Sequence, residues 1–253
     1  MDDKKTGIKQ NLTNYGDLGF STFLRKSFIK GLGYSDEMLD KPIVGIINTF
    51  SDYNSCHGNV PDLIQSVRAG ILAKGAIPLE FPTISVHEAF SYPTSMYLRN
   101  LMAMDTEEMI RAQPMDSCVL IGGCDKTVPA EIRGALSGEM PVIQLVTGPM
   151  LTGSNRSERV GACTECRRLW AKFRADEIDE AEINEANNQR VPTVGTCGVM
   201  GTASTMAMIA ETLGMMPPDS SCAPAVSSER RRISEKTGQI AVDIAINKRR
   251  PSS

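Results

Sequence analysis

The chain has 253 residues and a mass of 27.5 kDa, which allows one large domain or two small ones. A hydrophobic content of 41% and a charged content of 23% are typical of globular proteins and exclude a disordered or fibrous chain. The 27 basic and 30 acidic side chains give a net charge of −3, and no apolar run approaches the roughly 20 residues that cross a bilayer. We therefore expect neither nucleic acid nor a membrane as a partner.

The cysteines are the first chemically informative feature. Residues 1–12 are charged and lack the apolar core of a secretion signal. Seven cysteines, an odd number, in a chain without such a signal favour reduced thiols and predict a cytoplasmic protein. In that setting the thiols are candidate metal or cluster ligands. Because only His57 and His87 are present, a histidine-rich zinc site is excluded by counting.

In chain order, residues 1–40 are polar and predict an extension with one helix over residues 20–29. Apolar runs then predict strands over residues 42–49, 78–84, 117–121, 141–147 and 191–194. Apolar residues at helical spacing predict helices over residues 60–73, 95–104, 106–113, 129–136, 164–188 and 201–214. Pro82 makes the second strand an edge strand or a short one.

This alternation predicts an α/β domain over residues 41–253, with three layers and a mainly parallel sheet that carries helices on both faces. The apolar run over residues 238–247 is followed by only a few residues. A domain rarely stops directly after such a run, so we expect the chain to be part of a larger architecture.

Three of the predicted strands are followed by a cysteine, namely Cys56, Cys124 and Cys197. Ligands of open α/β sheets bind beyond the carboxyl ends of the strands, so parallel neighbours would bring these thiols to one rim. Three converging thiolates would suit an iron–sulfur cluster with one incomplete ligand position. The alternative is that they are small core residues near strand ends. Spacing alone favours that alternative, because no two of the three form a CxxC pair.

Residues with oxygen ligands follow two of the predicted strands, 78–84 and 117–121. Glu88 and Asp125 carry the carboxylates that Mg²⁺ prefers. As isolated features they are more often helix caps or members of surface ion pairs. Lys126, next to Asp125, is ordinarily a salt-bridge partner or an anion binder.

Cys163 and Cys166 form the one CxxC pair of the sequence. A redox or zinc pair is one interpretation of this spacing. Two thiols on one face near the start of a helix is the interpretation we favour, because no second CxxC exists.

Residues 122–129, with the sequence GGCDKTVP, resemble the Cys-Asp-Lys-Thr/Ile-x-Pro motif of the dihydroxy-acid and sugar-acid dehydratase family. Further matches follow in the same order along residues 15–245. They are residues 45–52 (GIINTFSD), 55–59 (SCHGN), 80–82 (EFP), 148–150 (GPM) and 195–206 (GTCGVMGTASTM). Because several matches occur in the same order, the resemblance is specific. It favours a cluster over small core cysteines.

The resemblance implies a role for each candidate residue. Cys56, Cys124 and Cys197 match the family's cluster ligands, which hold a [2Fe–2S] centre in many members and a larger cluster, such as [4Fe–4S], in others. Glu88 and Asp125 match its Mg²⁺ ligands. Lys126 matches a lysine that is carbamylated in some members and then binds Mg²⁺, which would make it part of the catalytic site.

The implied reaction is loss of water from a 2,3-dihydroxy carboxylic acid. The iron takes the C3 hydroxyl as leaving group, Mg²⁺ holds the carboxylate and the C2 oxygen, and a base removes the C2 proton. The resulting enol becomes a 2-oxo acid. Two positive centres suit this chemistry because hydroxide is a poor leaving group and the C2 proton is weakly acidic.

One departure from the family pattern concerns the base. In the family it is thought to be a serine of a β-rich C-terminal domain, and this sequence stops before that domain. We therefore expect the chain to hold the metal sites but to turn over poorly unless another chain complements it. The alternative is a truncated, catalytically inactive module that binds a ligand or a partner. Family members commonly assemble as homo-oligomers.

Substrate choice has a weak indicator in the sequence. The Glu80-Phe-Pro and Cys-Asp-Lys-Thr segments are closer to the sugar-acid branch than to the branch of branched-chain amino acid biosynthesis.

Overall fold

The computed structural model describes residues 6–12, 15–161 and 164–249. Its strands are β1 (Ile43–Asn48), β2 (Ile77–Pro82), β3 (Ser117–Gly122), β4 (Val142–Val146), β5 (Gly153–Asn155) and β6 (Glu158–Val160). Its α-helices are α1 (Leu18–Lys30), α2 (Val60–Ala73), α3 (Ser95–Ala112), α4 (Thr127–Ser137), α5 (Thr164–Arg174), α6 (Glu180–Arg190), α7 (Thr202–Thr212) and α8 (Ser228–Asn247). Short 3₁₀ turns are η1 (Gly7–Lys9), η2 (Ser55–His57) and η3 (Glu88–Phe90).

The central sheet has four parallel strands in the order β2-β1-β3-β4. Its register pairs Ile43 with Ile77 and Val44 with Ser117, so the carboxyl ends of β1, β2 and β3 finish close together. β2 lies at the edge of the sheet, as Pro82 predicts, because a proline has no N–H to donate to a further strand.

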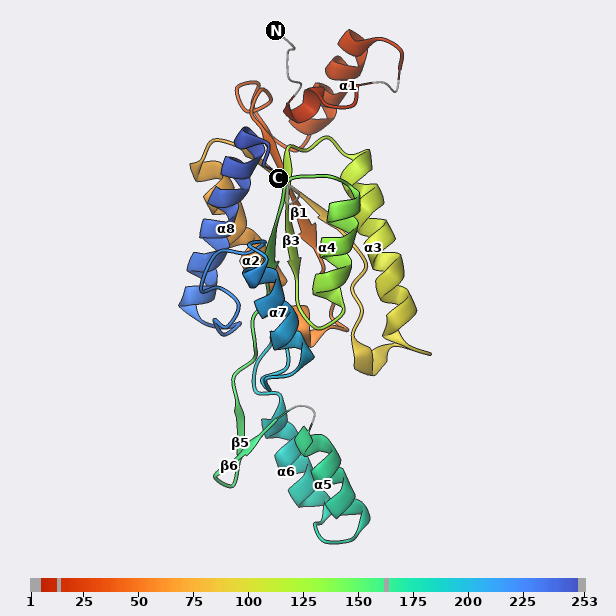
Figure 1. Ribbon diagram of the computed structural model, residues 1–253, viewed down its shortest axis with the longest axis vertical. Coiled ribbons are helices and arrows are strands. Elements are labelled where there is room, and N and C mark those ends of the chain that lie inside the picture. The colour runs from red at the N-terminus through yellow and green to blue at the C-terminus, as the bar shows by residue number, and fades with distance from the viewer. Residues whose placement is uncertain (1–5, 13–14, 162–163, 250–253) are drawn as a thin grey trace.

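Helices cover both faces of this sheet, which confirms the three-layer α/β prediction (Figure 1). Alternate residues of each strand point to opposite faces. Val44, Ile46 and Val119 pack against α2 and α8, whereas Ile43, Ile47 and Leu120 pack on the side of α3 and α4. Both faces are buried, which is why the strands are nearly continuous apolar runs.

α2 and α8 pack unusually closely against each other. Gly70 on α2 faces the backbone of α8, where an added Cβ would lie 2.0 Å from the carbonyl oxygen of Glu235. Gly238 on α8 faces α2, and its added Cβ would lie 2.3 Å from the carbonyl oxygen of Val67. The apolar layer over this face of the sheet therefore depends on two positions without a side chain.

Two features extend beyond the sheet at opposite ends (Figure 1). α1 lies near its amino end, where Ile8 and Leu39 are buried in the apolar core. An arm made of β5, β6, α5 and α6 extends from the other end. The described helices include none that is long and apolar enough to cross a membrane.

Four predicted elements differ from the structure. Residues 95–113 form one helix, α3, because Asp105 between the two predicted segments does not interrupt it. Residues 164–188 form two helices, α5 and α6, and the second begins where the side chain of Asp179 caps it. Residues 191–194 form no strand, and a single bridge between Pro149 and Thr196 replaces it. Pro192 in this segment has no N–H for a ladder.

The carboxyl group of Glu131, on α4, is fully buried. Gln144 of β4 donates a 2.8 Å hydrogen bond to it. Burial raises the pKa of Glu131 to about 8, although the Gln144 bond and the charge of Arg99 act in the opposite direction. The folded chain therefore keeps this carboxyl protonated at neutral pH.

Stability is expected to fall as the pH rises from 4.5, the ordinary pKa of a glutamate, to about 8. In that window the unfolded chain releases the Glu131 proton and the folded chain retains it, at a cost of about 1.4 kcal/mol per pH unit. Glu131→Gln should flatten this dependence in urea unfolding at pH 5 and pH 8. Equal slopes for wild type and variant would show that the folded carboxyl is already ionised.

Candidate metal centre

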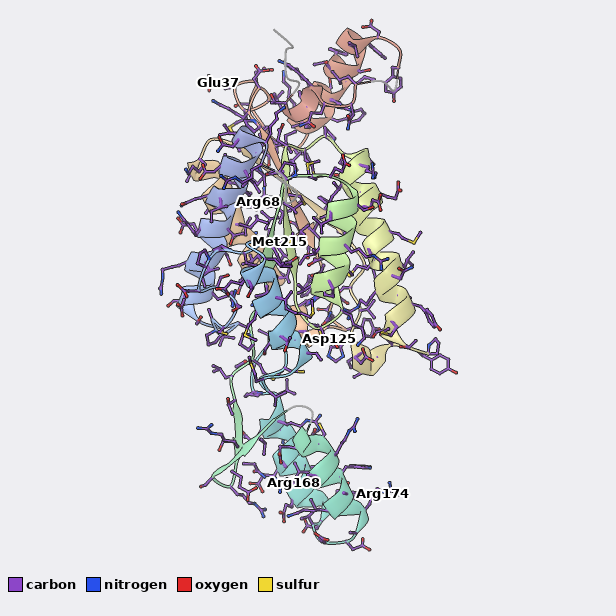
Figure 2. All side chains as sticks on the ribbon, in the orientation of Figure 1. Glu37, Arg68, Asp125, Arg168, Arg174 and Met215 are labelled. Atoms are coloured by element: carbon purple, nitrogen blue, oxygen red, sulfur yellow. The ribbon has the colours of Figure 1, made fainter. Side chains whose placement is uncertain are left out.

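The candidate residues lie at the carboxyl ends of β1, β2 and β3, on the end of the sheet that faces the arm. Figure 2 shows Asp125 at this end, with Arg168 and Arg174 on the arm beyond it and Glu37 at the opposite end. η2 follows β1 and carries Cys56, whereas η3 follows β2 and begins with Glu88. The turn between β3 and α4 carries Cys124, Asp125 and Lys126. The parallel register therefore brings these segments to one rim.

Two of the three predicted thiols lie close enough to shift each other's pKa. Cys56 and Cys124 share a side-chain hydrogen bond, and Cys197 lies close enough for its charge to influence Cys56. The bond to Cys124 and burial raise the pKa of Cys56, and the same bond lowers the pKa of Cys124. Cys56 thus keeps its proton and donates it, while Cys124 is the sulfur that favours the thiolate form.

His57 joins the two segments that carry these thiols. Its ring is completely buried; Nε2 accepts the N–H of Gly123 at 2.9 Å, and Nδ1 lies 2.8 Å from the carbonyl oxygen of Thr49. Because Nε2 accepts, the proton of the neutral ring is on Nδ1 and is donated to Thr49. Burial lowers the His57 pKa to about 4, so the ring stays neutral and serves as a fixed spacer between β1 and β3.

Cys197 reaches the rim although no strand precedes it. Thr196 exchanges backbone hydrogen bonds of 2.9 Å with Gly148 and Met150, which follow β4. Gly195 donates its N–H to the carbonyl oxygen of Ser55 at 3.1 Å, directly beside Cys56. Gly195 has a φ of 120°, a conformation that L side chains rarely adopt. Cys197 therefore lies at the rim, as predicted, but these backbone hydrogen bonds hold its segment there and not the predicted strand.

Cys124 has a left-handed backbone, with a φ of 76°. This conformation is uncommon for a residue other than glycine and costs about 1 kcal/mol or more. Such strain at a residue with soft-ligand chemistry is typical of a functional position.

Glu88, Asp125 and Lys126 form an ion-pair cluster. The Lys126 ammonium lies 2.7 Å from a Glu88 oxygen and 3.3 Å from an Asp125 oxygen. Burial by itself would lower the Lys126 pKa, but the two carboxylates outweigh it and raise this pKa. Hydrogen bonds from Lys126 and Ser95 lower the pKa of Glu88. A positive charge therefore already lies between the two carboxylates.

Sequence reasoning gave no role to three further residues that support this cluster. Ser95 donates to Glu88, and the Thr202 hydroxyl at the start of α7 donates to Asp125 at 3.2 Å. Arg99 donates to the carbonyl oxygen of Val86 and to the Thr127 hydroxyl. The four-residue spacing of Ser95 and Arg99 on α3 places them on one helix face, which is a pattern that the sequence contains.

The donor sets fit two groups of different chemistry. Among the described residues, no three His, Cys, Asp or Glu side chains converge as they would around a single ion. The three thiols are soft donors of the type that binds iron–sulfur clusters. The two carboxylates, which already pair with the Lys126 ammonium, are hard oxygen donors of the type that Mg²⁺ prefers. Cys163 of the CxxC pair lies outside the described residues.

Comparison with known proteins identifies the relatives of this chain. A sequence model described as dihydroxy-acid/6-phosphogluconate dehydratase N-terminal matches residues 41–253. The chain belongs to this dehydratase family. The chain is 39% identical over 218 residues to the 6-deoxy-6-sulfo-D-gluconate dehydratase of Pseudomonas putida, a match that covers 86% of this chain and 38% of that protein.

Other members of the family show the same partial coverage. The chain is 41% identical over 239 residues to the L-arabinonate dehydratase of Rhizobium leguminosarum, covering 94% of this chain and 41% of that protein. It is 33% identical over 234 residues to the dihydroxy-acid dehydratase of Clostridium botulinum, covering 90% and 42%. The chain thus spans about two fifths of the length of these dehydratases.

Proposed function

We propose that this chain carries the metal-binding part of a hydro-lyase that converts a 2,3-dihydroxy carboxylic acid into a 2-oxo acid. Cys56, Cys124 and Cys197 would hold the iron–sulfur cluster, and Glu88, Asp125 and Lys126 would hold Mg²⁺. The observation that carries the proposal is the proximity of the Cys56 and Cys124 thiols, which shift each other's pKa although they are 68 residues apart in the sequence. Lewis-acid activation of substrate oxygens is the chemistry that the two groups would supply when bound.

The residues of this chain have distinct parts in such a site. His57, neutral and bonded on both nitrogens, keeps the Cys56 and Cys124 segments at a fixed separation. Ser95 and Thr202 orient the carboxylates of Glu88 and Asp125. Lys126 supplies the cation that balances these carboxylates, and a carbamate on Lys126 would instead add an oxygen ligand for Mg²⁺. The base for the C2 proton would lie in the part of the dehydratases that these residues do not cover.

We propose a sugar acid as the substrate class. Two relatives named for sugar acids, the sulfogluconate and arabinonate dehydratases, are 39% and 41% identical to the chain, against 33% for the dihydroxy-acid dehydratase of Clostridium botulinum. The exposed Glu80 side chain accepts a hydrogen bond from Asn48 at the rim, in the segment that favours the same branch. We further propose a cytoplasmic location and a homo-oligomer, or a complex with a chain that supplies the C-terminal part.

The test combines metal analysis with turnover. The anaerobically purified chain is expected to contain iron and sulfide, to absorb visible light, and to form 2-oxo acid from pentonates only at a background rate. Addition of the C-terminal part of a sugar-acid dehydratase should raise the rate. Colourless protein without iron would contradict the cluster. A chain that holds iron and Mg²⁺ but stays inactive with every complement would be a binding module instead.

A further inference from the structure

Arg99 is a buried cation without an ion pair. Its side chain is 5% exposed, and none of the salt bridges among the described residues includes it. The Nε atom has no hydrogen-bond partner. A buried guanidinium that lacks a carboxylate partner is costly, so its presence calls for a role other than an ordinary ion pair.

The two bonds that Arg99 does make join separate segments. One amino group donates to the carbonyl oxygen of Val86, two residues before Glu88, in a stretch between β2 and η3 that has no regular structure. The other donates to the hydroxyl of Thr127, the first residue of α4 and the neighbour of Lys126. One planar side chain therefore bridges the two segments that present oxygen ligands.

Arg99 is itself well anchored. It lies on α3 one turn after Ser95, whose hydroxyl donates to Glu88, and both side chains are buried. Farther along α3, Asp105 accepts the N–H of Ile84 at 3.1 Å, which holds the same irregular stretch from a second point. The face of α3 that covers this edge thus forms a rigid base beneath Glu88.

We propose that Arg99 is a positioning residue that sets the separation between Glu88 and the Asp125–Lys126 pair and thereby tunes their affinity for a divalent cation. This inference rests on the proposed function. Replacing a residue that orients a metal ligand without contacting the metal typically lowers metal affinity 10- to 100-fold.

The test uses Mn²⁺ as the probe, titrated into the full chain and followed by electron paramagnetic resonance. Thr127→Val removes the acceptor of one Arg99 bond with little change in shape and is expected to weaken Mn²⁺ binding about tenfold. Thr127→Ser keeps the hydroxyl and should restore wild-type affinity. Arg99→Lys keeps the charge but cannot bridge both acceptors, and should weaken binding as Thr127→Val does.

Thr106→Val is the matched control for Thr127→Val. Thr106 is a fully buried threonine of α3 whose hydroxyl has no partner, so this variant should bind Mn²⁺ like the wild type. Thermal unfolding of the metal-free variants checks that each is folded. Wild-type affinity in Thr127→Val would overturn the role of Arg99 and leave the proposed function intact. Wild-type protein that binds no Mn²⁺ would overturn both.

Discussion

Cys124→Ser is expected to abolish the iron and sulfide content of the anaerobically reconstituted chain. Cys124 is the thiol whose interaction with Cys56 favours the anionic form. A serine hydroxyl ionises far less readily and is a poor ligand for iron. Cys56→Ser and Cys197→Ser should have the same effect, because a cluster with three cysteine ligands already lacks one. Iron and sulfide analysis and the visible spectrum measure the loss.

Two cysteines that are not among the three candidate ligands serve as controls. Cys222 is exposed, and Cys118 is buried within β3 among apolar residues. Cys222→Ser and Cys118→Ala should both retain iron, although the second removes a packed side chain. If Cys124→Ser retains as much iron as these controls, the three thiols are structural and the proposed function fails.

Gly238→Ala is expected to lower the free energy of unfolding by about 1–2 kcal/mol, which is the steric cost of overpacking less the helix gain of alanine. The added methyl group would lie 2.3 Å from the carbonyl oxygen of Val67, and backbone cannot move aside as a side chain does. Overpacking of this kind costs about 1–3 kcal/mol or more, which exceeds the roughly 1 kcal/mol that alanine gains over glycine in a helix. Gly70→Ala should be at least as harmful, since its contact is 2.0 Å. Urea unfolding followed by circular dichroism measures both.

Lys236→Ala is the control on the same helix. Lys236 is exposed on α8, so the replacement should change the free energy of unfolding by less than about 0.5 kcal/mol. A Gly238→Ala protein as stable as Lys236→Ala would mean that α2 and α8 separate without cost. The apolar layer over that face of the sheet would then be less tightly packed than the structure indicates.

Much of the fold was predictable because its determinants are local. The buried strands are short apolar runs, and the prediction for α2 over residues 60–73 matches the helix bounds. Residues 191–194 have the composition of a strand but form none. The backbone pairing nearest to them is a single bridge between Pro149 and Thr196. Composition indicates that a segment prefers an extended form, whereas pairing depends on which backbone groups lie opposite.

The candidate site was likewise predictable only in part. The types of Cys56, Cys124, Glu88, Asp125 and Lys126, and their places after strands, were visible in the sequence. The supporting bonds were not. Ser95, Arg99 and His57 act through partners 7 to 66 residues away, and no local pattern records such a distance.

The sequence by itself determined the parallel α/β architecture and the residue types available for metal binding, because both follow from local polarity and from what comes after each strand. Only the tertiary structure decided that the Cys56 and Cys124 thiols interact, that a lysine lies between Glu88 and Asp125, and that Arg99 joins their segments. Those arrangements arise from the register of the sheet and from the crossing of helices, which bring together groups that are distant along the chain.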